Sequence, residues 1–266
     1  MRIEIEGTSA YAYTGARAFD PALPTVVFVH GAAHDHSVWA LQSRYFAHHR
    51  RNVLAVDLPG HGRSGGDPLA SVEAIAEWLA TLLDATCIEH AALVGHSLGA
   101  LAVLETAARQ PEPVESIALL APSVPMPVAD ALLDAAKAND HLAYELITGW
   151  SFAPGRQLGG NQQPGVWMTG NALRLMERSH SGALYADLLA CHRYAGGLAA
   201  AGKVRCPTLM ILGQRDLMAP AKNSQALIAA LTGCRVVSIA DCGHSLMTEA
   251  PDAVLDALRE FLSARS

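Results

Sequence analysis

Short apolar segments alternate with amphipathic segments along most of this chain, and no other feature restricts its fold as strongly. Runs such as "TVVFVH" (25–30) and "NVLAVDL" (52–58) are rich in β-branched residues and lack polar alternation. Both faces of such a strand should therefore be buried. Strands of this kind, separated by helices, form a parallel sheet that helices cover on both sides. The sequence predicts an α/β fold.

The predicted elements follow this alternation. The expected strands are short and apolar, and they span residues 2–6, 25–30, 52–58, 91–95, 116–121, 208–213 and 235–240. The expected helices show apolar residues at helical spacing, and they span residues 71–86, 98–110, 221–231 and 251–263. Ser71 is the expected N-cap of the first helix, because its hydroxyl can accept a hydrogen bond from a free amide of the first turn.

One long segment interrupts the alternation. Residues 123–200 contain helical patterns and glycine-rich turns such as "GRQLGGNQQPG" (155–165), but no convincing strand. We expect an inserted helical cap over residues 123–200, placed on a core formed by residues 1–122 and 201–266.

Composition excludes several classes of protein. A net charge of −6 without any basic run argues against nucleic acid as a partner. No stretch approaches eighteen apolar residues, which argues against a membrane span. The five cysteines are dispersed without a C-x-x-C pair, and the N-terminus lacks the apolar run of a secretory signal. These features favour a cytoplasmic protein with reduced thiols. They leave its oligomeric state open.

The segment "GHSLG" (95–99) has the form G-x-S-x-G and lies between a predicted strand and a predicted helix. A serine at such a turn takes a strained backbone conformation that presents its hydroxyl at the carboxyl edge of the sheet. The amides at the start of the following helix can stabilise negative charge there. This context indicates that Ser97 is a catalytic nucleophile.

A serine hydroxyl needs a general base, and that base needs an orienting acid. In this architecture the acid and then the histidine follow the serine along the chain. His244 lies just past the last predicted strand, and it is the one histidine beyond residue 192. Asp216 follows the strand over 208–213 and is the favoured acid. Asp241 is a rival, but it stands only three residues from His244.

These residues carry a resemblance to the α/β-hydrolase superfamily over essentially the whole chain. The matching landmarks occur in the family's order and are "VHGAAHDHSVW" (29–39), "DLPGHGRS" (57–64), "GHSLG" (95–99), "CPTLMILGQRD" (206–216) and "GHSLMTEAP" (243–251). The resemblance implies a mostly parallel, eight-stranded sheet flanked by helices, with a helical cap inserted.

The resemblance also implies an oxyanion hole made of two backbone N–H groups, those of Ala32 and Leu98. Ala32 stands where many lipases carry the HGGG pattern, so this chain departs from that group. Backbone donation does not depend on the side chain. His34, near the oxyanion loop, and Trp150, in the predicted cap, are the expected substrate contacts.

The function most often associated with these residues in the family is ester hydrolysis. We therefore expect a serine hydrolase that cleaves a small or medium carboxylic ester or lactone through an acyl-enzyme on Ser97. Two alternatives stay open. One is a C–C bond hydrolase or a hydroxynitrile-lyase-like enzyme with the same three residues, and the other is a ligand-sensing relative without catalysis.

Two further motifs do not predict a cofactor or a metal. "GHGRSGG" (60–66) has the glycines of a dinucleotide loop, but Pro59 precedes it and Asp67-Pro68 follows where a helix should continue. "HGAAHDH" (30–36) contains three histidines and an aspartate without a ligand spacing typical of metal sites. We expect activity without cofactor or metal.

Overall fold

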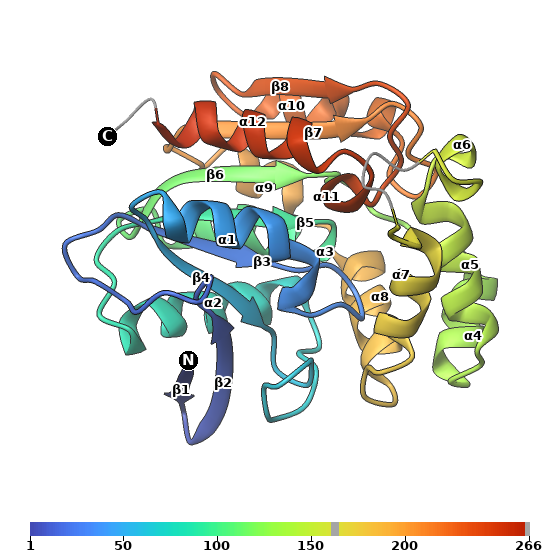
Figure 1. Ribbon diagram of the computed structural model, residues 1–266, viewed down its shortest axis with the longest axis horizontal. Coiled ribbons are helices and arrows are strands. Elements are labelled where there is room, and N and C mark those ends of the chain that lie inside the picture. The colour runs from blue at the N-terminus through green and yellow to red at the C-terminus, as the bar shows by residue number, and fades with distance from the viewer. Residues whose placement is uncertain (161–164, 264–266) are drawn as a thin grey trace.

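The computed structural model describes residues 1–160 and 165–263. Within these residues eight strands form one sheet in the order β1-β2-β4-β3-β5-β6-β7-β8 (Figure 1). The strands are β1 (Arg2–Ile5), β2 (Thr8–Tyr13), β3 (Thr25–Val29), β4 (Asn52–Asp57), β5 (Ala91–His96), β6 (Val114–Leu120), β7 (Thr208–Gly213) and β8 (Arg235–Ile239). From β4 to β8 every neighbouring pair is parallel, whereas β1 and β2 add an antiparallel edge. The predicted α/β fold with a mostly parallel sheet is confirmed.

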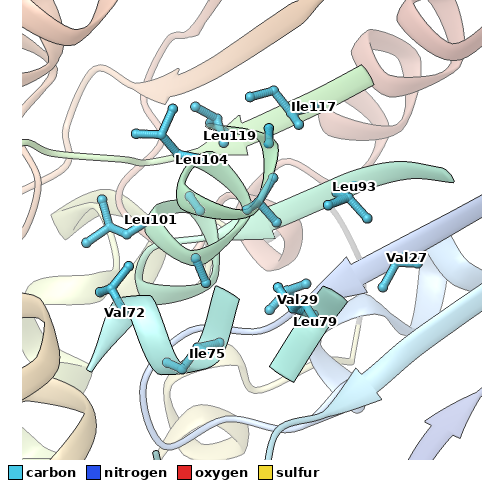
Figure 2. Packing of buried hydrophobic residues seen from close by; sticks show 14 of the residues in the cluster. Val27, Val29, Val72, Ile75, Leu79, Leu93, Leu101, Leu104, Ile117 and Leu119 are labelled. Atoms are coloured by element: carbon cyan, nitrogen blue, oxygen red, sulfur yellow. The ribbon is translucent and has the colours of Figure 1, made fainter. Parts of the chain in front are cut away.

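Side chains of the central strands alternate between the two faces of the sheet, as the pleat requires. In β3, Val27 and Val29 belong to one apolar cluster with residues of α2 (Val72–Ala85) and α3 (Leu98–Arg109), and Figure 2 shows Val29 beside Leu79 of α2. On the other face, Val26 and Phe28 belong to the apolar cluster that includes residues of α1 (Ala40–His48) and α12 (Pro251–Ser263). The uninterrupted apolar runs are thus explained by burial on both faces.

Helices fill the chain between β6 and β7. They are α4 (Asp130–Lys137), α5 (Leu142–Ser151), α6 (Pro154–Gln157), α7 (Met168–Met176), α8 (Ala183–Arg193) and α9 (Gly197–Ala201). Figure 1 shows α4 to α8 beyond the ends toward which the parallel strands point. Among these helices, α4, α5, α7 and α8 share a small apolar cluster, which also includes Ala33 of the loop after β3. We refer to residues 123–200 as the cap segment.

The sequence prediction differs from the structure in a few places. The edge strand β2 was not predicted, because its alternating small and polar residues are only half buried. The predicted helix over 221–231 is instead a 3₁₀ turn, η2 (Ala221–Ser224), followed by α10 (Gln225–Ala230). The predicted turn over 155–165 begins inside α6, and its residues 161–164 lie outside the described residues.

Two local expectations can be checked directly. The hydroxyl of Ser71 accepts a hydrogen bond from the amide of Ala74 at 3.1 Å, so the predicted N-cap of α2 is confirmed. No helix among the described residues is both long enough and apolar enough to cross a membrane.

Candidate active site

Ser97 occupies the sharp turn between β5 and α3, and its backbone is strained. Its φ is +53° and its ψ is −116°, a conformation that residues other than glycine rarely adopt. Its amide donates to the carbonyl of Leu120 at 2.9 Å, which fixes the turn against β6. A Cβ at Gly99 would lie 2.5 Å from the carbonyl oxygens of His30 and Val29, and one at Gly95 would collide with the Gly99 carbonyl. Both glycines therefore permit the close packing that holds Ser97 in place.

His244 and Asp216 come together at the ends of two neighbouring strands. His244 Nδ1 lies 2.8 Å from Asp216 Oδ2, and both side chains are buried. The other carboxylate oxygen of Asp216 accepts from the amides of Met218 and Ala219, each at 2.8 Å. Asp216 is thus held on the Nδ1 side of the ring, which leaves Nε2 available as a base. Asp241, the rival acid, is exposed and faces Arg215 at 3.6 Å.

The environment of Asp216 favours its ionised form. Burial alone raises the pKa of this carboxyl group. The positive charge of His244 and its hydrogen bond outweigh that effect, with help from the amides of Ala219 and Met218, and the pKa is lowered overall. A carboxylate at this position stabilises an imidazolium that forms on His244.

Ser97, His244 and Ala32 line one cavity of about 200 Å³ between the sheet and the cap segment. The two predicted substrate contacts, His34 and Trp150, line the same cavity. Most of the remaining lining is apolar and comes from Met126, Pro127, Val128, Leu132, Ile147, Leu188, Leu217 and Met218. The residues that the sequence analysis expected to act through their side chains therefore lie at one site. Ser97, His244, His34 and Trp150 line the cavity, and Asp216 contacts His244.

A second cavity of about 490 Å³ adjoins the first, since His34 and His96 line both. Its lining is more polar. Asn171, Arg174, Arg178, Ser37 and Thr248 contribute to it.

Of the two predicted oxyanion donors, Leu98 directly follows Ser97 and Ala32 lines the same cavity as Ser97. Leu98 is the first residue of α3, and the amides of a first helical turn have no partner within the helix. Ala32 belongs to the loop after β3, which His30 anchors. His30 Nδ1 donates to the Gly31 carbonyl at 2.8 Å, and its Nε2 accepts from the Leu58 amide at 3.1 Å. This loop is therefore tied to the end of β4.

Three buried imidazoles near the site are neutral. Burial lowers the pKa of His30 and of His34 to about 4. Burial also lowers the pKa of His96 well below its ordinary value, and the charge of nearby His244 lowers it further. His96 Nε2 donates to the His244 carbonyl at 2.9 Å. These rings therefore add no charge beside His244 at neutral pH.

Backbone contacts join the cap segment to the loop that carries His244. The carbonyl of Ser151 accepts from the amides of His244 and Ser245 at 2.8 and 3.0 Å. The buried carboxyl group of Glu249 accepts from Gly243 and from Ala153, each at 2.9 Å. Sequence reasoning did not assign a role to Glu249, because its partner Ala153 lies 96 residues away.

Within the described residues, Asp35, His36 and Asp57 form the one group of possible metal ligands. Their atoms already carry hydrogen bonds. His36 Nδ1 lies 2.8 Å from Asp57 Oδ1, and the amides of His36 and Arg63 donate to the same carboxylate. Asp35 caps a 3₁₀ turn through the Ser37 amide at 2.8 Å. The glycine-rich stretch over 60–66 forms turns and does not lead from a strand into a helix, so it lacks the geometry of a dinucleotide loop.

Comparison with known proteins shows to which family the chain belongs. The profile of the alpha/beta hydrolase family matches residues 26–257. The chain belongs to the alpha/beta hydrolase family. Its fold and family identify it as a hydrolase.

Individual relatives are similar over most of their length. A pimeloyl-[acyl-carrier protein] methyl ester esterase of Chromobacterium violaceum is 30% identical, over 91% of this chain and 96% of its own. A putative carbamate hydrolase, RutD, of Pseudomonas savastanoi pv. phaseolicola is 29% identical, over 81% of this chain and 85% of its own. The enol-lactonase from Burkholderia xenovorans LB400 shares the fold with a TM-score of 0.87 at 21% identity, and the likeness covers 99% of this chain and 100% of that one.

Proposed function

We propose that this alpha/beta hydrolase cleaves a small or medium carboxylic ester or lactone through an acyl-enzyme formed on Ser97. The observation that carries the proposal is the contact of His244 Nδ1 with Asp216 Oδ2 at 2.8 Å, with Ser97 and His244 on the wall of one cavity. The names of the relatives support it, because esterases and carbamate hydrolases both transfer an acyl group to water.

The reaction proceeds in two steps. His244 Nε2 removes the proton from the Ser97 hydroxyl as its oxygen attacks the substrate carbonyl carbon. The amides of Ala32 and Leu98 stabilise the negative charge on the carbonyl oxygen, and His244 then protonates the departing alcohol. In the second step His244 deprotonates a water molecule, which cleaves the acyl–Ser97 bond. The acid is released and Ser97 regains its proton.

The cavities indicate the size and polarity of the substrate. The cavity at Ser97 has a volume of about 200 Å³, below the roughly 300–1,000 Å³ typical of small-molecule sites, and therefore suits a small group. Its apolar lining suits an acyl chain of that size. The adjoining polar cavity of about 490 Å³ suits a bulkier, polar alcohol group. A substrate with a short acyl chain and a polar alcohol fits both.

The first test removes the nucleophile. Ser97→Ala should lower kcat/KM for p-nitrophenyl butyrate by about three orders of magnitude or more, since no acyl-enzyme can form. His244→Ala should be nearly as damaging, and Asp216→Asn somewhat less. Ser238→Ala, at an exposed position of β8, is the matched control and should leave turnover unchanged.

A covalent label provides a readout that does not depend on the choice of ester. A fluorophosphonate should add one adduct to the wild-type protein at Ser97, detected by intact mass and peptide mapping, and none to Ser97→Ala. If Ser97→Ala keeps more than a tenth of the wild-type rate, the proposed mechanism is wrong. Failure of the wild-type protein to cleave any ester or lactone in a substrate panel counts against the substrate class.

A further inference from the structure

Asp187, on cap helix α8, contacts the loop that carries the proposed oxyanion donor. Its Oδ2 accepts a hydrogen bond from the Ala33 amide at 2.8 Å. The same oxygen lies 2.9 Å from Nε2 of His61, which belongs to the loop after β4. Both side chains are at most 2% exposed. One carboxylate oxygen of the cap segment therefore holds two loops of the core.

The partners of His61 require a doubly protonated ring. Its Nδ1 lies 3.0 Å from the carbonyl oxygen of Pro59, and its Nε2 faces the Asp187 carboxylate. Both are acceptors, so both ring nitrogens must donate. Asp187 and His61 thus form a buried ion pair with charge-assisted hydrogen bonds.

The groups around His61 act on its charge in opposite directions. Burial lowers its pKa, but the charge and hydrogen bond of Asp187, the Pro59 carbonyl and the more distant charge of Asp57 outweigh burial, and the pKa is raised. His30 also faces this ring, with centroids 5.1 Å apart. Because the pKa of His30 is lowered to about 4, it is neutral when His61 is charged.

Ala33 needs such a partner. Its φ is +52°, in the left-handed region that favours glycine, so the surrounding contacts must hold it there. Relaxation to a negative φ would rotate the neighbouring peptide units. The Ala32 N–H, proposed to face the substrate carbonyl oxygen, is one residue away.

We propose that the Asp187–His61 pair positions the oxyanion loop, so that the cap segment must be seated on the core for the Ala32 N–H to stabilise the transition state. This inference rests on the proposed hydrolase function. Neither residue lines the described cavity at Ser97, so both act as positioning residues through Ala33.

Substitutions of Asp187 separate positioning from substrate binding. Asp187→Ala should lower kcat for p-nitrophenyl butyrate on the order of tenfold to a hundredfold and change KM less than twofold, because only the transition state is affected. A trifluoromethyl ketone analogue should bind more weakly by a similar factor. Asp187→Asn keeps an acceptor for the Ala33 amide and should retain an intermediate kcat. Asp134→Asn, at an exposed position of cap helix α4, is the control and should match the wild type.

A pH profile gives a second readout that a merely structural role would not produce. The raised pKa of His61 means that the ion pair persists to a higher pH than an ordinary imidazole would stay charged, and that it is lost as the pH rises through the raised pKa. The ratio of wild-type kcat to Asp187→Asn kcat should therefore be largest below that pKa and should narrow as the pH rises above it. A ratio that is constant with pH contradicts a role for the charged pair.

Kinetic constants should be expressed per active site titrated with a fluorophosphonate, so that unfolded protein is not counted. If Asp187→Ala does not fold, Asp187→Asn decides. A folded Asp187 variant with kcat within twofold of wild type, or with a loss confined to KM, overturns the inference. Turnover that survives in Ser97→Ala overturns the proposed function instead, so the two failures are distinguishable.

Discussion

At the scale of single residues, the neutral histidines around the site make stability depend on pH. The pKa of His30 and His34 is lowered from an ordinary value of 6.5 to about 4, and that of His96 is lowered as well. Each ring therefore binds about one more proton in the unfolded chain than in the folded protein over that range. His61 has a raised pKa, so toward pH 4 it is protonated in both the folded and the unfolded protein and does not add to this pH dependence.

The free energy of unfolding should consequently fall as the pH drops from about 6.5 toward 4, because His30 and His34 each contribute a slope of up to about 1.4 kcal/mol per pH unit and His96 acts in the same direction. Urea denaturation at a series of pH values measures this slope. His34→Gln should lower this slope, because the variant lacks one of the titrating rings, whereas Ser238→Ala, at an exposed position without a titratable group, is the control and should not. A wild-type stability that does not change over this interval contradicts the prediction.

The proposed catalytic residues could be predicted from the sequence because each lies close to a recognisable strand end. Ser97 has glycines on both sides, and Asp216 and His244 follow the last two strands. Asp187 could not be predicted in this way. It lies on a helix of the cap segment, and its partner Ala33 is 154 residues away. No local pattern encodes that pairing, which depends on how the cap segment packs.

At the scale of elements, the turn from β5 into α3 depends on close backbone approach. Gly99→Ala should destabilise the protein by about 1–3 kcal/mol, because the added Cβ would lie 2.5 Å from the carbonyl oxygens of Val29 and His30. Gly149→Ala, in α5, is the matched control. Nothing lies within 4 Å of its added Cβ, so it should be neutral or stabilising by roughly 0.5–1 kcal/mol.

Chemical denaturation of both variants tests this difference. Equal stability of Gly99→Ala and wild type would show that the turn has more room than the structure gives it. The elements themselves were largely predictable, since burial on both faces leaves an uninterrupted apolar run. β2 was not, because an edge strand that is only half buried has no such run.

At the scale of the whole molecule, hydrogen bonds fix the cap segment on both sides of the cavity. Asp187 binds the oxyanion loop, and Ser151 binds the loop of His244. We therefore expect an acyl-length optimum set by the cavity of about 200 Å³ beneath the cap segment, with rates falling steeply for long chains. We expect no increase in the hydrolysis rate when the substrate concentration exceeds its solubility, because the cap segment need not open at an oil–water interface.

A series of p-nitrophenyl esters measures this optimum. Ile147→Ala removes part of the apolar wall, which enlarges the cavity, and it should move the optimal acyl length toward longer chains. Ile228→Ala, on α10 and outside that wall, should leave the optimum in place. A wild-type maximum at long chains, together with activation at an oil–water interface, would contradict an acyl site limited by this cavity.

The backbone contacts of Ser151 and Ala153 also bear on how such enzymes diversify. The Ser151 carbonyl accepts the amide of His244, and the Ala153 amide donates to Glu249, which also binds Gly243. Part of the support for the proposed base is therefore supplied by the cap segment. In a chimera that replaces residues 123–200 by the corresponding segment of another enzyme, the new segment must again supply an acceptor for the His244 amide and a donor for Glu249. We therefore expect a functional exchange of substrate range to require that the cap segment and the histidine loop be exchanged together.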